Sequence, residues 1–143
     1  MTTLRTYDIT QVKLVLGSVP VEGLSAEGVV IEQENDDWAE VEDTAGNILR
    51  SRIPNRSALA TVNVLPGSTA SAQLNTLRAL DKQTGRAPFT FYLRDFSSGT
   101  EVTAARAYFR RGVSVSMTSE AAAEAWEIVL VGPEFKIQPL PVS

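Results

Sequence analysis

The sequence contains neither cysteine nor histidine among its 143 residues. Without cysteine, the chain cannot form disulfide bonds, thiolate nucleophiles or thiolate metal sites. Without histidine, it lacks the commonest general base and the commonest metal ligand, so Ser-His-Asp and Cys-His arrangements and histidine-bearing zinc sites are excluded. We therefore predict that the protein is not an enzyme and that it has no catalytic, cofactor-binding or metal-binding residues.

Long apolar runs and an excess of basic residues are also missing. The N-terminal stretch MTTLRTYDIT has no apolar signal core, and no apolar run reaches the ~20 residues that cross a bilayer. The formal net charge of −4 and the pI of about 4.8 disfavour a sequence-independent grip on nucleic-acid phosphates. We expect a protein that is made in the cytoplasm, does not insert into membranes and does not hold DNA.

Alternation of apolar and polar residues is the main pattern that is present. It occurs in short segments separated by turn residues, which is typical of an antiparallel β domain. The seven expected strands lie in ITQVKLVLG (9–17), EGVVIEQE (27–34), NILRSRIP (47–54), SALATVNVLP (57–66), FTFYLRDF (89–96), TEVTAARAYFRR (100–111) and AWEIVLVG (125–132). We expect the first two to pair as a hairpin across the turn segment from Pro20 to Gly23, and Ser97 to Gly99 to connect the fifth and sixth strands.

One segment has helical spacing instead. From Ser68 to Asp81, apolar residues recur every three to four positions, with Ser and Thr available to cap the start and Gly85 after the end. The stretch SEAAAEA (119–125) could add a helical turn or remain a loop. Three prolines space the segment 133–143, which favours an extended C-terminal arm. The fold class is therefore mainly β: a two-sheet antiparallel sandwich or barrel with one flanking helix, forming a single domain over residues 1–143.

The stretch from Glu32 to Asp43 carries seven carboxylates around Trp38, and a basic segment follows it. Paired carboxylates can serve glycoside hydrolysis or bind divalent cations, but a calcium-loop spacing is absent and charge runs are usually solvated. The tryptophan fits either an interface between proteins or a contact with its own sheet. Strand alternation places Arg50 and Arg52 on one face, where they could neutralise the acidic stretch across a hairpin or across a subunit boundary. The candidate inter-subunit residues are Asp36, Asp37, Trp38, Glu40, Arg50, Arg52 and Arg56.

The segment GRAPFTFYLRDFSSG holds four of the eight phenylalanine and tyrosine residues. Aromatics on a sheet can stack nucleic-acid bases, but an RNA-binding sheet would have basic surroundings. Phe89, Phe91 and Leu93 share one face at a period of two, so we expect them to pack in the core.

The order of these segments resembles the tail tube proteins of contractile-tailed bacteriophages. The resemblance runs from Tyr7 to Gly132, and its most telling motifs are NDDW (35–38) and NRSALATVNVL (55–65), followed by PFTFYLRD and the tryptophan strand AWEIVLV. It implies a two-sheet β fold with a flanking helix, related to the tubes of type VI secretion systems. It also implies that six copies form a ring whose strands close into one continuous β-barrel, and that such rings stack into a hollow tube.

As partners, the resemblance implies further copies of the chain together with tail sheath, baseplate and tape-measure proteins. Genomic DNA would pass through the lumen without specific binding, and the location would be the tail of a virion. We expect the lumen to be lined by small, polar or acidic side chains, with strands around Val12 to Val30 and Ala104 to Val115 contributing. Two alternatives remain: another tail or baseplate component such as a tube terminator or initiator, and a soluble ligand-binding β domain.

Overall fold

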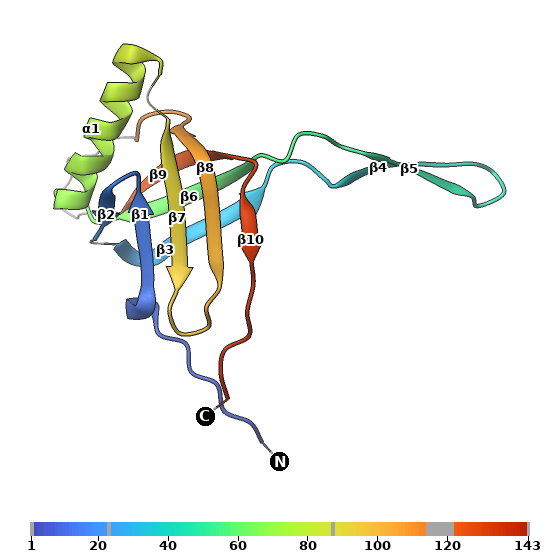
Figure 1. Cartoon of the computed structure of the whole chain (residues 1–143), viewed down its shortest axis with the longest axis horizontal. Helices are drawn as coiled ribbons and strands as arrows, with labels where there is room; N and C mark the ends of the chain where they lie inside the picture. The colour runs from blue at the N-terminus through green and yellow to red at the C-terminus, as the bar shows by residue number, and fades with distance from the viewer. Residues whose placement is uncertain (1, 23, 87, 114–121, 143) are drawn as a thin grey trace.

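The computed structural model describes residues 2–22, 24–86, 88–113 and 122–142, and its main feature is a strongly curved eight-stranded antiparallel sheet (Figure 1). Its strands are β1 (Val12–Leu16), β2 (Val19–Val21), β3 (Leu24–Gln33), β6 (Ala58–Val64), β7 (Phe89–Asp95), β8 (Glu101–Phe109), β9 (Glu124–Val131) and β10 (Glu134–Lys136). Along the sheet the order is β2-β1-β7-β8-β9-β6-β3, and β10 pairs with β8 outside this path. The sheet nearly closes on itself like a barrel, which confirms the predicted fold class.

The sheet turns a corner between β8 and β9. Strand β8 pairs with β9 from Arg106 to Phe109 and with β10 from Glu101 to Thr103. The chain passes from β9 to β10 through Gly132, whose φ of +59° lies in the left-handed region that favours glycine. The bend lies between the part of β8 that pairs with β10 and the part that pairs with β9. In Figure 1, β1, β7 and β8 therefore cross over β3, β6 and β9.

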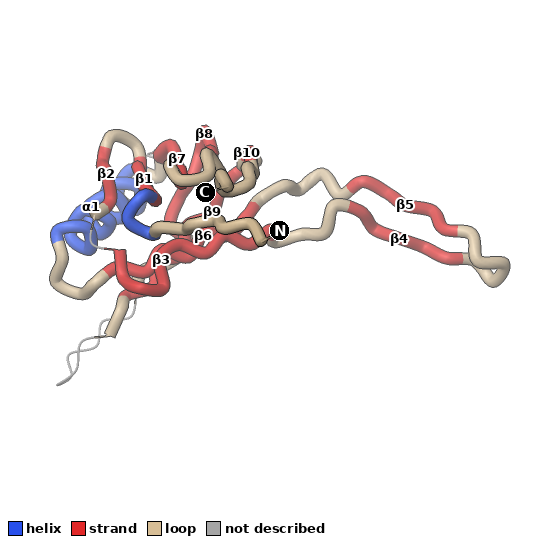
Figure 2. Tube along the Cα trace, turned by 90° about the horizontal axis from the view of Figure 1, so that it is seen from below, coloured by secondary structure: helices blue, strands red, loops and turns tan. Residues whose placement is uncertain are grey.

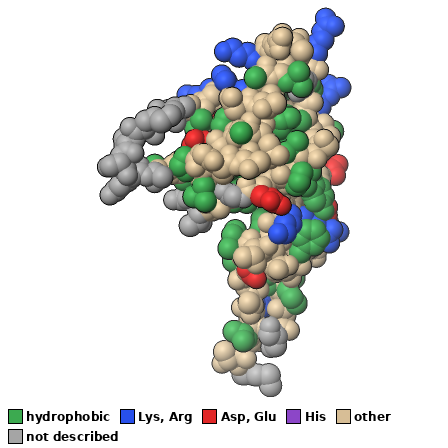
Figure 3. Space-filling view, turned by 90° about the vertical axis from the view of Figure 1, so that its left-hand side faces the viewer, with side chains coloured by type: hydrophobic (Ala, Val, Ile, Leu, Met, Phe, Trp, Pro, Cys, Tyr) green, Lys and Arg blue, Asp and Glu red, His purple; other side chains and the backbone are tan. Residues whose placement is uncertain are grey.

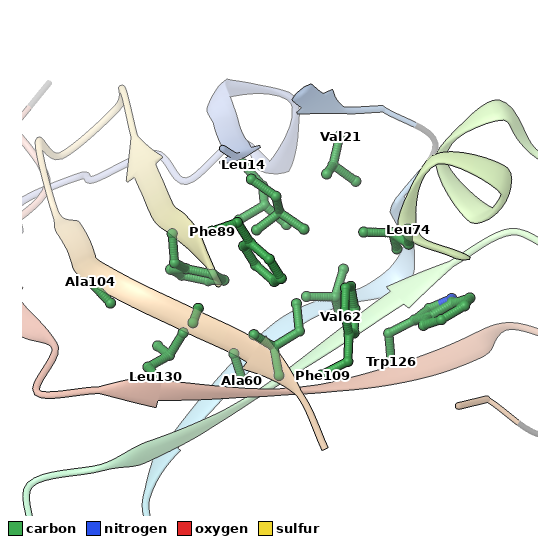
Figure 4. Packing of buried hydrophobic residues seen from close by; sticks show 14 of the residues in the cluster. Leu14, Val21, Ala60, Val62, Leu74, Phe89, Ala104, Phe109, Trp126 and Leu130 are labelled. Atoms are coloured by element: carbon green, nitrogen blue, oxygen red, sulfur yellow. The ribbon is translucent and has the colours of Figure 1, made fainter. Parts of the chain in front are cut away.

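The core fills the space between these two sets of strands (Figure 4). Strand β6 buries every second residue, and Phe91 on β7 and Leu14 and Leu16 on β1 are fully buried from the other side. Phe109 joins the two halves, since its ring centroid lies 5.3 Å from that of Phe89 and 5.5 Å from that of Trp126. The predicted core role of Phe89 and Phe91 is confirmed.

The helix α1 (Thr69–Thr84) covers one end of the curved sheet. Ser68 is its N-cap and accepts a hydrogen bond from the Ser71 amide, and Gly85 ends it with a φ of +66°. Ala70 and Leu74 are its buried residues. The predicted helix and both of its caps are confirmed, and the helix runs one turn beyond Asp81 because Gly85 is the first residue that stops it.

A second, two-stranded sheet stands apart from the body. Strands β4 (Trp38–Glu42) and β5 (Ile48–Arg52) pair only with each other in the described part of the chain, and they form a hairpin that projects far to one side (Figures 1 and 2). The chain leaves the body after β3 and returns to it at β6. We call residues 34–57 the projecting hairpin.

All seven predicted strands are confirmed, as β1, β3, β5, β6, β7, β8 and β9. The predicted connection of β7 and β8 by Ser97 to Gly99 is also confirmed. The predicted first hairpin is wrong, because β1 pairs with β2 and β7 while β3 pairs with β6. The reason is the short strand β2, which turns back at Gly17 and takes the edge of β1 that β3 was expected to occupy.

Near the C-terminus, β10 adds to β8, and the side chain of Thr100 exchanges hydrogen bonds with the backbone of Gln138. Of the segment 119–125, where a helical turn or a loop was expected, residues 119–121 lie outside the described residues, Ala122 and Ala123 belong to no helix or strand, and Glu124 and Ala125 begin β9. Within the described residues, no helix combines the length and apolar character needed to cross a membrane.

Candidate functional site

The projecting hairpin is joined to the body by a polar stem. The Glu34 amide donates to the Ser57 carbonyl at 3.2 Å, and the Ile53 amide donates to the Asp37 carbonyl at 3.1 Å. Pro54 interrupts the ladder between these bonds because it has no amide proton. Arg56 forms an ion pair of 3.0 Å with Asp37, and Arg110 at the end of β8 forms one of 2.6 Å with Glu34. These contacts hold the base of the hairpin against the sheet.

Trp38 lies just beyond this stem and is held by two arginines of the opposite strand. In the register of the hairpin, Trp38 faces Arg52 and Glu40 faces Arg50. The guanidinium carbon of Arg50 lies 4.0 Å from the centroid of the Trp38 ring, and that of Arg52 lies 5.6 Å from it. The predicted shared face of Arg50 and Arg52 is confirmed, and these arginines contact the tryptophan of their own chain.

The acidic stretch is neutralised in part within the same hairpin and in part by Arg110 of the body. Asp37 is paired with Arg56, Glu34 with Arg110, and Glu40 stands opposite Arg50. The antiparallel turn thus places a basic strand beside an acidic one, which is one of the two arrangements that the sequence left open. The carboxylates are spread along the hairpin, and among the described residues no group of acidic side chains is placed to hold a metal ion.

The tip of the hairpin is an ordered turn built around Asp43. Its carboxylate accepts hydrogen bonds from the Asn47 side chain and backbone at 2.8 Å and from the Ala45 amide at 2.9 Å. Gly46 has a φ of +88°, which a residue with a side chain rarely adopts. The hydrogen bonds from Asn47, followed by those from Ala45 and Gly46, lower the pKa of the Asp43 carboxyl below its ordinary value. The tip is therefore a defined structure at neutral pH.

Three large apolar side chains are exposed beside this turn. Val41 and Leu49 face each other across the hairpin with 66% and 69% of their surfaces exposed, and Ile48 is 60% exposed on the opposite face. An isolated two-stranded hairpin is only marginally stable in water. A projecting hairpin that displays three apolar side chains at its far end has the character of a docking element.

The larger sheet also leaves edges open. Strand β3 pairs with β6 on one side, and no described strand pairs with its other edge. Strand β2 ends the sheet at the opposite side. A long unpaired edge is a template for another strand, and soluble proteins usually cover it.

Between β1, β2 and the start of β3 lies a groove of about 610 Å³. Its walls are mostly apolar, and one lysine and one glutamate, Lys13 and Glu22, line it as well. The apolar lining includes Ile9, Val12, Leu14, Pro20, Val21 and Leu24. The groove marks the place where the curved sheet fails to close.

The candidate residues of the sequence analysis all lie on the projecting hairpin, but they have different surroundings. Trp38, Arg50 and Arg52 form one cluster, and Asp37 and Arg56 form another. Asp36 and Glu40 are exposed. Strand β4 and the apolar tip were not predicted from the sequence, because the acidic stretch was interpreted as a solvated charge run. The alternation in WAEVE, followed by a glycine turn and the alternation in ILRSR, could have revealed both.

No family model and no curated protein matches the sequence. Solved structures do share the fold. A chain in the cryo-EM structure of the anti-feeding prophage cap, the AFP tube-terminating cap, matches with a TM-score of 0.61 and 15% identity over 95% of this chain and 94% of that chain.

Two further matches come from an extracellular contractile injection system, PVC. Its sheath/tube terminator in the extended state gives a TM-score of 0.56 at 15% identity, covering 92% of this chain and 97% of the other. Its sheath-tube complex in the extended state gives 0.53 at 13% identity, covering 96% and 93%. The fold is therefore similar, over nearly the whole length, to chains found in tube terminator and sheath-tube assemblies of contractile injection systems.

Proposed function

We propose that the chain is a tail-tube-like structural subunit of a contractile injection apparatus and that it acts at the end of the tube, as a terminator. The observation that carries this proposal is the match over 95% of this chain and 94% of a chain in a tube-terminating cap. The role is structural, and it requires no catalytic group. Its partners are further copies of the chain and the sheath and tube proteins of the same apparatus.

The open edges of the structure support assembly into a ring. Strand β3 has an edge of ten residues that no described strand covers, and the projecting hairpin is exposed along nearly its full length. Pairing such edges between copies around a closed ring removes the free backbone groups that favour aggregation. We take the ring to contain six copies, with its strands closing into one barrel around a lumen, as the resemblance to tail tube proteins implies.

A second candidate is the repeating subunit of the tube itself. The match to a chain in a sheath-tube complex, at a TM-score of 0.53, favours this reading. In that case rings would stack, with sheath, baseplate and tape-measure proteins as partners and DNA or another cargo in the lumen. The candidate inter-subunit residues, from Asp36 to Arg56, would contribute to contacts between copies in either case.

The purified protein tests the proposal directly. Negative-stain electron microscopy combined with analytical ultracentrifugation should show closed rings whose size stays constant as the concentration rises, because a terminator ends growth. Tubes that lengthen with concentration would favour the second candidate. A stable monomer at high concentration, alone and with tube and sheath proteins, would overturn both.

A further inference from the structure

We propose that the apolar tip of the projecting hairpin of one copy inserts into the groove between β1, β2 and β3 of a second copy. This inference rests on the proposed assembly of copies and names the surfaces that meet. The hairpin leaves the body at one end of the long axis, and the groove lies toward the other end, near β1 and β2 (Figures 1 and 2). A patch and a pocket at opposite ends of one chain give a head-to-tail contact, which produces closed rings or helical stacks.

The chemistry of the two surfaces matches. Val41, Ile48 and Leu49 present apolar side chains at the tip, and the groove of about 610 Å³ is lined mainly by apolar side chains. Figure 3 shows the face opposite the hairpin, where hydrophobic side chains are exposed at scattered positions with a few acidic and basic ones among them. The tip side chains are exposed in a monomer, and so are Ile9 and Pro20 of the groove lining, whereas Leu14 and Val21 already belong to the core. Docking therefore removes apolar area from water on each side.

The charges on the two surfaces are complementary. The hairpin from Trp38 to Leu49 carries Glu40, Glu42 and Asp43 and no basic residue. On the groove wall, Lys13 stands directly opposite Arg94 in the sheet, and Lys13 takes part in no ion pair among the described residues. Like charges opposite each other across strands are unfavourable. A carboxylate from the tip of a second copy would relieve this repulsion, whereas Glu22 on the same groove would oppose its approach.

Cysteine pairs test the contact, because the wild-type chain has no cysteine. One protein carries Leu49→Cys at the tip and another carries Pro20→Cys in the groove. Mixed and mildly oxidised, they should form a disulfide between the two copies, seen by mass spectrometry. A matched control replaces Pro20→Cys by Ile137→Cys, which is 78% exposed on the C-terminal arm and should not cross-link to the tip.

Tip-to-tip disulfides of Leu49→Cys, or equal cross-linking to Ile137→Cys, would overturn the inference. So would rings or tubes that form without any cross-link between the tip and the groove, and this result would leave the proposed function intact. A protein that never assembles would instead remove the proposed function.

Substitutions at both surfaces give a second readout by sedimentation. Leu49→Ser should weaken association at least about tenfold, since burying a leucine is worth ~1.5–3 kcal/mol and 1.4 kcal/mol is a factor of ten. Lys13→Glu should weaken association by up to about fivefold, as expected for an exposed ion pair. Glu22→Lys should strengthen it, and Glu42→Lys should restore part of the loss caused by Lys13→Glu. Stronger association of Lys13→Glu together with weaker association of Glu22→Lys would contradict the predicted charge complementarity.

Discussion

The guanidinium of Arg50 stacks over the indole ring of Trp38 at 4.0 Å, across the two strands of a hairpin that extends away from the body of the protein. Arg52 approaches the same ring at 5.6 Å. The contact joins the acidic strand to the basic strand at the base of the hairpin. It therefore stabilises the pairing of the two strands there, and the proposed contact between copies depends on an intact hairpin.

Trp38→Ala should weaken assembly and leave the body folded. An exposed cation–π contact is worth ~0.5–1 kcal/mol, and the hairpin contributes nothing to the buried core. The thermal unfolding of the monomer should therefore change little, while rings become scarcer in sedimentation. The other tryptophan is the matched control: Trp126 is 2% exposed in the core, and Trp126→Ala should cost about 3–5 kcal/mol of folding free energy. Unfolding of the Trp38 variant, or its normal assembly, would contradict this prediction.

Leu74→Ala should destabilise the fold by about 2–5 kcal/mol, because Leu74 is fully buried where α1 packs on the sheet. Leu80→Ala in the same helix is the control. Leu80 is 50% exposed, and its replacement by alanine keeps helix propensity, so its effect should stay within about 0.5 kcal/mol. Urea denaturation of both variants measures the difference. Equal midpoints would mean that the helix is not docked through Leu74.

The turn at the hairpin tip should be sensitive to acid. The hydrogen bonds from Asn47 and Ala45 lower the pKa of Asp43 in the folded turn. The ionised carboxylate therefore stabilises the turn above the ordinary pKa of about 3.9, and this contribution is lost as the pH falls through the lower folded pKa.

A carboxyl-detected NMR titration should give Asp43 a midpoint below its ordinary value. Asn47→Ala removes the side-chain donor and should move the midpoint upward. Identical midpoints in the two proteins would show that Asn47 does not hold the turn.

Neither the free protein nor its assemblies should bind duplex DNA at physiological salt. The chain has a formal net charge of −4, and Arg56, Arg110 and Arg111 are each paired with a carboxylate of the same chain. Fluorescence anisotropy with a labelled duplex should show no change up to high protein concentration. Binding that weakens steeply with salt would reveal a basic surface and contradict the proposed passage of cargo without binding.

The local elements follow from residue patterns along the chain. Period-two alternation located seven strands because it reports which side chains face a core, and Ser68 and Gly85 bounded the helix because capping depends on neighbouring residues. The absence of cysteine and histidine excluded disulfide bonds, thiolate sites and histidine-based catalysis. These features depend on residues close together in the chain, so they can be derived without coordinates.

Which strands pair and which surfaces stay open became clear from the three-dimensional structure and not from residue patterns. Alternation gives β1 and β3 the same character, yet the short strand β2 takes one edge of β1, so that β1 pairs with β2 and β7 while β3 pairs with β6. The same long-range arrangement leaves the groove unfilled and sends Val41, Ile48 and Leu49 into solvent. A residue pattern specifies which face of a strand is buried, whereas the strand with which it pairs depends on how the entire sheet closes.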